Sequence, residues 1–129
     1  MKILDFNKLG RSFKAAGEGL IAAFHEQTFR IFCFCALTVV LLMFVFRLSL
    51  REKIIVVFLV TLNLTLELIN SQIEKILDIV QPAFDQRVKL IKDISAAAVL
   101  LASLGAAIIG TLIFLPYFSR LLNFFCLGV

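Results

Sequence analysis

Three long stretches without charged side chains constrain this chain more than any other feature of its sequence. Residues 31–46 carry no charge, residues 54–66 stay uncharged until Glu67, and residues 94–118 carry none at all. About 20 apolar residues in a helix are enough to cross the hydrocarbon core of a bilayer. With 61% hydrophobic residues and a mean hydropathy of +1.03, a chain of 129 residues has too little interior to bury them in water. We therefore expect an all-α integral membrane protein with spans at about 28–47, 54–80 and 92–118.

The segment before the first span predicts a different kind of helix. Its apolar residues recur at intervals of three and four with charged residues between them, so a helix over about residues 5–26 has one apolar face. Such a helix lies flat on a membrane surface. Packing on a soluble core is the alternative, and it is disfavoured because the chain offers little soluble core. The apolar face consists of Phe6, Leu9, Phe13, Ala16, Leu20 and Phe24.

No repeat, linker or shift of composition divides the chain, so residues 1–129 are expected to form one domain. Pro82 should end the helix of the second span and make the connection to the third span short. The net charge of +4 on so apolar a chain suits anionic lipid headgroups, and it does not indicate nucleic-acid binding.

The distribution of lysine and arginine predicts the orientation, because these residues favour the cytoplasmic side of a membrane protein. Nine of them lie in the N-terminal stretch up to residue 30 or around the connection between the second and third spans, and four lie on the opposite side. The N-terminus and the second connection are therefore expected in the cytoplasm. The nine are Lys2, Lys8, Arg11, Lys14, Arg30, Lys75, Arg87, Lys89 and Lys92, and the four are Arg47, Arg51, Lys53 and Arg120.

The end of the second span carries a polar face. At about 100° per residue, Glu67, Asn70, Ser71, Glu74 and Asp78 fall within an arc of roughly 100° on one helix. Carboxylates near hydrocarbon cost a few kcal/mol each, so they should face a wet cavity that holds a compensating cation. Alternatively, Glu67 and Glu74 only pair with lysines at the membrane edge.

Three further charged residues belong at the same depth. Glu26 lies just before the first span, and Lys92 with Asp93 lies at the start of the third. Two carboxylates from separate helices suit Mg²⁺, which prefers one or two carboxylates together with substrate phosphates. Lys92 can neutralise phosphate charge in the same place. The pattern therefore indicates a magnesium and nucleotide site.

Other routes to nucleotide binding or catalysis are missing from the sequence. It contains neither GxxxxGK[ST] nor GxGxxG, so the common soluble nucleotide folds are excluded. His25 is the only histidine, which leaves no histidine-based triad or zinc site within one chain.

Two motifs resemble the bacterial integral-membrane diacylglycerol kinase and undecaprenol kinase family. Glu67-Leu68-Ile69-Asn70-Ser71-Gln72-Ile73-Glu74 is similar to the E-[IL]-[IL]-N-[ST]-x-I-E signature of that family, and Lys92-Asp93-Ile94-Ser95-Ala96-Ala97-Ala98-Val99 to its K-D-x-x-[AS]-[AG]-A-V. Glu26-Gln27-Thr28-Phe29-Arg30 is a looser match. The chain departs from the family at Pro82-Ala83-Phe84-Asp85, where Pro-Glu-Tyr-His is common, and at Gln72, where alanine is usual.

The resemblance implies a homotrimeric, multi-pass kinase of the bacterial inner membrane. Its reaction passes the γ-phosphoryl group of MgATP to a lipid alcohol, from diacylglycerol to phosphatidic acid or from undecaprenol to undecaprenyl phosphate. By the same resemblance, Glu67 is the general base, and Glu26 and Glu74 bind the metal and the nucleotide. Lys92 and Asp93 also contact the nucleotide, and Asn70 and Arg30 join Glu67 at the lipid substrate.

A protein of another class also remains possible from the residues alone. A small non-enzymatic transporter, or an assembly subunit, would use the carboxylates to carry ions or protons. It would show coupled flux without ATP consumption. The sequence does not select between diacylglycerol and undecaprenol.

Overall fold

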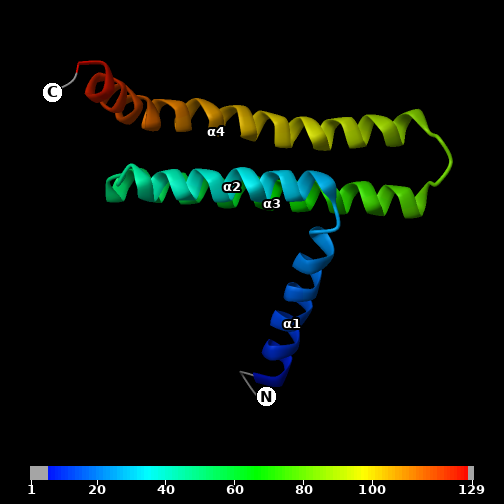
Figure 1. The fold of residues 1–129 in the computed structure, drawn as a ribbon. Coiled ribbons are helices and arrows are strands. Elements are labelled where there is room, and N and C mark those ends of the chain that lie inside the picture. The colour runs from blue at the N-terminus through cyan, green and yellow to red at the C-terminus, as the bar shows by residue number, and fades with distance from the viewer. Residues whose placement is uncertain (1–5, 128–129) are drawn as a thin grey trace.

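The computed structural model describes residues 6–127, and the side chains of residues 6–124. This part of the chain forms four helices: α1 (Phe6–Ala23), α2 (Gln27–Val45), α3 (Leu50–Val80) and α4 (Gln86–Leu127). The expected all-α architecture is confirmed (Figure 1). Residue 5, the expected start of the first helix, and Lys2 lie outside the described residues.

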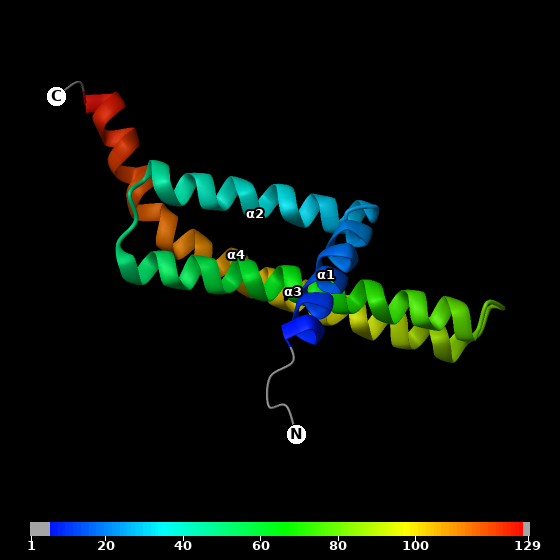
Figure 2. The same cartoon turned by 90° about the horizontal axis from the view of Figure 1, so that it is seen from below.

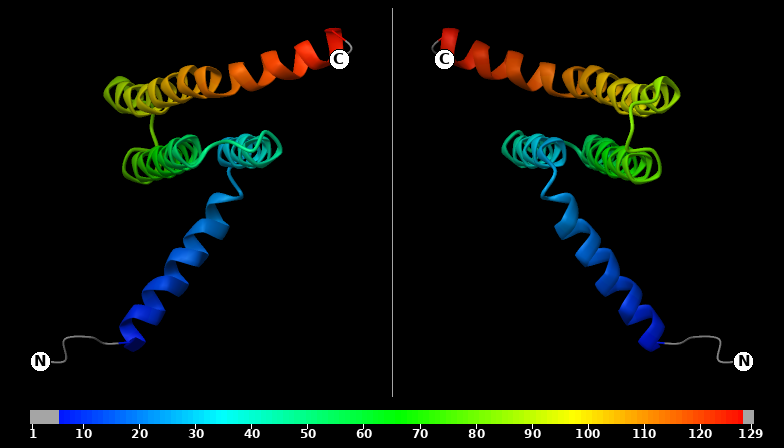
Figure 3. Two further views of the ribbon diagram at one scale, coloured as in Figure 1. Left: turned by 90° about the vertical axis from the view of Figure 1, so that its left-hand side faces the viewer. Right: turned by 90° about the vertical axis from the view of Figure 1, so that its right-hand side faces the viewer.

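Three of these helices are long and apolar enough to cross a membrane. They run over Gln27–Val45, Leu50–Val80 and Gln86–Phe124, with mean hydropathies of 2.4, 2.0 and 2.5. α3 packs against both α2 and α4. The three helices run antiparallel (Figures 1 and 2), and α2 and α4 lie on two different sides of α3 (Figure 3). The number of spans matches the expectation, and their ends differ from it in two places.

The second span begins earlier than expected, because a capping box starts α3 at Leu50. The side chain of Ser49 accepts from the backbone N–H of Glu52, and Glu52 Oε2 accepts from the backbone N–H of Ser49 at 2.8 Å. This exchange satisfies two donors that a helix end otherwise leaves unpaired. The charged residues before residue 54 therefore belong to the helix and do not precede it.

α4 is longer than the expected span over 92–118 at both ends. Asp85 Oδ1 accepts from the backbone N–H of Arg87 at 2.7 Å, which starts the helix at Gln86. Pro116 lies inside α4, and the helix continues to Leu127 after it. Figure 2 shows the C-terminal part of α4 turned away from the axis of the rest. A bend is the usual result of an internal proline, which lacks a backbone donor.

The buried apolar core of these three helices lies at the end where α2 turns into α3. Met43, Leu48, Val56 and Phe114 are buried there. The ring of Phe46 lies 4.9 Å from that of Phe118, centroid to centroid, and adds an edge contact to the same cluster. This packing holds the bent end of α4 against the turn between α2 and α3.

α1 stands apart from α2, α3 and α4. It projects crosswise from the start of α2 (Figures 1 and 3). Among its residues only Ala23 is buried. The corner is held by an edge-to-face contact between the rings of Phe24 and Phe29, whose centroids are 5.4 Å apart. The direction of α1 suits the expected surface helix, and its place on a membrane stays a prediction.

Candidate functional site

The polar face predicted for the second span exists on α3. Glu67 is 2% exposed and Asn70 is 8% exposed, so both are buried in a single chain. The side-chain amide of Asn70 donates to Glu74 Oε1 at 3.2 Å. Because residues spaced by three, four and seven share one face of a helix, these three side chains form a continuous polar strip along α3. We call Glu67, Asn70 and Glu74 the acidic strip.

The acidic strip contains oxygens without partners. Within the described residues, no hydrogen bond or ion pair reaches the carboxylate of Glu67, and the buried Oδ1 of Asn70 has no partner either. A buried carboxylate without a partner is costly, and most buried polar atoms in native proteins are hydrogen-bonded. The strip is therefore suited to a ligand that supplies positive charge or hydrogen-bond donors.

Glu26 reaches the neighbourhood of the acidic strip through an ion pair. Its Oε1 lies 2.9 Å from the Nζ of Lys75, the residue that follows Glu74. This pair joins the corner between α1 and α2 to the C-terminal third of α3. The structure thus brings Glu26 to the depth of Glu74, as predicted, with its carboxylate in an ion pair with Lys75.

Lys92 comes to the same end of α3 from the first turns of α4. Its ammonium group forms an ion pair with Asp78, which lies one turn after Glu74. Asp93 is exposed and binds Lys89 on its own helix, with Nζ and Oδ2 2.6 Å apart. Arg30 is exposed on α2. Lys92 is therefore placed beside the face that carries Glu74, whereas within the described residues no contact of Asp93 or Arg30 joins them to the acidic strip.

The residues present fit a hard cation that is completed by substrate. Among the described residues, no group of three His, Cys, Asp or Glu side chains converges as a ready metal cage. Glu74, Glu26 and the unpaired amide oxygen of Asn70 are oxygen ligands of the kind that Mg²⁺ takes. Because Mg²⁺ commonly keeps only one or two protein carboxylates and binds phosphate oxygens besides, a full protein cage is not needed.

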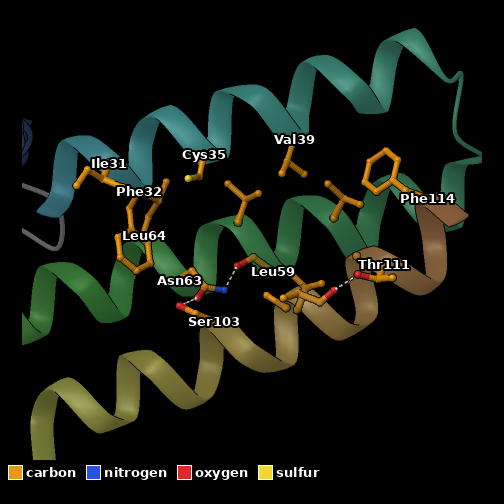
Figure 4. A pocket seen from close by; sticks show the side chains of 16 residues that line it. Ile31, Phe32, Cys35, Val39, Leu59, Asn63, Leu64, Ser103, Thr111 and Phe114 are labelled. Carbon is orange, nitrogen blue, oxygen red and sulfur yellow. Dashed lines mark hydrogen bonds between the residues drawn. The ribbon is translucent and has the colours of Figure 1, made fainter. Parts of the chain in front are cut away.

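A cavity of about 530 Å³ lies between α2, α3 and α4, and its lining on α3 ends at Leu64, three residues before Glu67. Leu64 and Phe32 line one end and Phe114 lines the other (Figure 4). The walls are apolar except for a few side chains, among which Asn63 and Ser103 point toward one another from α3 and α4. The Oγ of Ser103 donates to Oδ1 of Asn63 at 2.9 Å.

The sequence analysis missed this polar pair. Asn63 precedes Glu67 by one helical turn, so its place on the face of the acidic strip was readable from helix periodicity. Ser103 lies among the small residues of the third span, and nothing in its spacing identifies Asn63 as its partner. The pairing depends on the way α3 and α4 pack.

Comparison with known proteins finds relatives along most of the chain. The family described as prokaryotic diacylglycerol kinase matches residues 14–114, which include every candidate site residue. An undecaprenol kinase of Bacillus subtilis is 34% identical over 113 residues, covering 87% of this chain and 92% of that protein. A diacylglycerol kinase of Synechocystis sp. is 33% identical over 107 residues, covering 81% of this chain and 61% of that protein.

Proposed function

Since the chain belongs to the prokaryotic diacylglycerol kinase family and is a lipid kinase, we propose that it transfers the γ-phosphoryl group of ATP to the hydroxyl of a membrane lipid. The acceptor is diacylglycerol or undecaprenol, the substrates named for its relatives. Family membership favours this reaction over the transporter or assembly subunit that the residues alone also allowed.

One observation carries the proposal. Glu67 is 2% exposed and has no hydrogen bond or ion pair within the described residues, although it lies in the middle of an apolar helix. An ionisable side chain that is buried within a membrane span is energetically costly, so it is expected to have a functional role. A lipid hydroxyl beside Glu67 would give the carboxylate a donor. Glu67 then accepts the hydroxyl proton as the lipid oxygen bonds to the γ-phosphorus of ATP, and the bond from that phosphorus to the β-phosphate oxygen breaks and releases ADP.

The other residues of the site bind and orient the nucleotide. Glu74 and Glu26 would hold Mg²⁺, which would supply positive charge that neutralises the phosphates when it is bound. Asn70 holds Glu74 through the hydrogen bond between them. Lys92 contacts the phosphates, and Asp93 contacts the nucleotide further from the metal. Arg30 contacts the lipid substrate together with Glu67 and Asn70. These assignments follow the motifs of the family.

Nucleotide binding requires two ion pairs to rearrange. Glu26 is bound to Lys75, and Lys92 is bound to Asp78. All but Lys92 of these four side chains are more than a third exposed, and exposed ion pairs contribute little to stability. We infer that both pairs exchange for metal and phosphate at small cost. Phosphoryl transfer then depends on positioning and charge neutralisation, since little covalent chemistry is asked of the protein.

The decisive test compares Glu67→Gln with the unchanged protein in detergent or bilayers. The amide keeps the size of the side chain and cannot accept the hydroxyl proton, so turnover should fall by about two orders of magnitude or more. ATP binding should stay within about twofold, because the nucleotide contacts other residues. Glu18→Gln, on the exposed face of α1, is the matched control. Turnover of Glu67→Gln at the unchanged rate would remove Glu67 from the role of base.

A further inference from the structure

The cavity between α2, α3 and α4 contains one polar side chain whose hydrogen bonding is incomplete. Asn63 is 9% exposed. Its amide nitrogen donates to the backbone oxygen of Leu59 at 2.8 Å, and its Oδ1 accepts from Ser103 Oγ at 2.9 Å. A primary amide has two N–H donors. The second amide hydrogen of Asn63 therefore has no acceptor among the described residues.

Helix association alone accounts for only part of this arrangement. Polar side chains often hold spans together by hydrogen bonds across the interface, and the bond to Ser103 does so here. The remaining amide hydrogen contributes nothing to that contact. In a cavity with apolar walls, an unpaired donor is unfavourable. It would be satisfied by a ligand that brings an acceptor into the cavity.

The position of Asn63 limits which part of a lipid it can meet. Asn63 precedes Glu67 by four residues, so it lies on the same face and about 6 Å further along α3. The cavity continues from there toward Val56 and Phe114 between apolar walls (Figure 4). A lipid whose hydroxyl reaches Glu67 and whose chain fills the cavity must pass Asn63 with the atoms that directly follow the hydroxyl.

The two acceptor lipids differ in those atoms. In diacylglycerol an ester carbonyl lies a few bonds from the free hydroxyl, within the reach of one helical turn. In a polyprenol the same stretch is hydrocarbon and offers no acceptor. A buried donor discriminates strongly against a substrate that leaves it unpaired. Asn63 thus distinguishes an ester-linked lipid from an isoprenoid alcohol.

We propose that Asn63 is a specificity-determining residue that donates its free amide hydrogen to an ester carbonyl of a diacylglycerol whose acyl chain occupies the cavity between α2, α3 and α4. The proposal rests on the lipid kinase function proposed above. It adds a second contact to the substrate, deeper in the membrane than Glu67. Ser103 positions Asn63 by fixing its Oδ1.

The test measures ATP-dependent phosphorylation of three acceptors by the full chain: a diester diacylglycerol, the dialkyl ether glycerol of equal chain length, and a polyprenol. The ether keeps the shape and the hydroxyl and lacks the carbonyl. One hydrogen bond to a buried donor corresponds to about a tenfold difference in kcat/KM between diester and ether. A ratio near one for the unchanged protein would overturn the proposal without any variant being made.

Three variants separate ligand contact from helix packing. Asn63→Leu keeps the branching of the side chain at Cγ and removes the amide. It should lower kcat/KM for the diester by about tenfold, to near the value for the ether, which itself changes little. Ser103→Ala removes the bond between helices and should leave a clear preference for the diester. Thr65→Leu replaces an exposed polar residue at the same depth of α3 and should leave the diester-to-ether ratio unchanged.

The outcomes distinguish this inference from the function on which it rests. If none of the three acceptors is phosphorylated, the proposed function is contradicted. Phosphorylation of all three with an equal loss in Asn63→Leu contradicts only the role of Asn63, because a purely structural defect affects every acceptor alike. A polyprenol turned over faster than the diester also overturns the inference and leaves the kinase intact.

Discussion

Glu52 and Glu67, both on α3, show how hydrogen-bond partners determine the role of a residue. The Glu52 carboxylate accepts from Ser49 Oγ at 2.6 Å, from the Ser49 backbone N–H at 2.8 Å and from Tyr117 Oη at 2.8 Å. All three hydrogen bonds reach its Oε2, and they start α3 and hold α4 against it. Glu67 has no such partners within residues 6–127. The first carboxylate is structural, and the second is available to a ligand.

The metal role proposed for Glu74 predicts a change in the response to magnesium. Glu74→Ala removes one of the two proposed carboxylate ligands, so half-maximal activity should need about tenfold more Mg²⁺, or more. A Mg²⁺ titration of lipid phosphorylation at saturating ATP measures this. Glu18→Ala, which removes an exposed carboxylate from α1, should titrate like the unchanged protein. An unchanged titration of Glu74→Ala would exclude Glu74 as a ligand.

At the scale of elements, contacts within one helix were predictable and contacts between helices were not. The alignment of Glu67, Asn70 and Glu74 follows from helix periodicity alone. The bonds of Lys75 to Glu26 and of Ser103 to Asn63 depend on rotation and distance between packed helices, which no spacing encodes. The start of α3 was readable as a capping box. The continuation of α4 past Pro116 was not, because a proline can either end a helix or bend it.

The turn from α2 to α3 contains the one non-glycine residue with a positive φ in the described chain. Arg47 has a φ of 50°. Its N–H donates to the oxygen of Phe44 at 3.1 Å, and the N–H of Leu48 donates to the oxygen of Met43 at 3.2 Å. This is the Schellman arrangement of a helix end, whose left-handed position is usually glycine. The packing of Leu48 on Met43 adds the apolar contact that commonly accompanies it.

Replacing Arg47 by glycine should therefore stabilise the turn. The left-handed conformation costs roughly 1–2 kcal/mol when the residue has a side chain. Glycine avoids this cost, but part of the gain is offset because glycine loses more conformational entropy on folding. We expect Arg47→Gly to raise the free energy of unfolding by about 0.5–1 kcal/mol, measured by denaturant titration in detergent. Arg47→Ala removes the same charge and keeps the side-chain penalty, so it should show no gain. Equal effects of the two substitutions would assign the change to charge.

At the scale of the whole molecule, one chain exposes more surface than a soluble protein of its mass. Its accessible surface is 10324 Å² for 14.5 kDa. A folded soluble monomer of that mass exposes about 6,900 Å² by the usual scaling. The excess lies largely on apolar residues of α2, α3 and α4, such as Phe34, Leu101 and Ile108. Lipid or further copies of the chain must cover it.

The resemblance of the motifs to their family leads us to expect that three copies share this surface. Three thin spans enclose only a small cavity, and association in membranes favours small residues such as those of α4 around Gly105 and Gly110. Native mass spectrometry of the active protein in detergent should give the mass of a trimer. A fully active monomer at the same detergent concentration would contradict this expectation. Glu67→Gln should assemble like the unchanged protein, so assembly and chemistry can be scored separately.

The final prediction concerns orientation, which links the site to its nucleotide. With α2, α3 and α4 each crossing the membrane, α1 and the connection between α3 and α4 lie on one side, and the turn at Arg47 lies on the other. ATP is supplied from the cytoplasm, so Glu26, Glu74 and Lys92 are functional only if the first side is cytoplasmic. The excess of lysine and arginine on that side leads to the same expectation.

Single cysteines in a background without Cys33, Cys35 and Cys126 test this orientation in intact cells. An impermeant maleimide should label Arg51→Cys from outside, since residue 51 is exposed near the turn. It should label Ser12→Cys and Ala83→Cys only after the membrane is permeabilised. The reverse pattern would place the acidic strip away from cytoplasmic ATP. Because lipid phosphorylation requires ATP and the strip to meet, that single result would refute the kinase mechanism together with the topology.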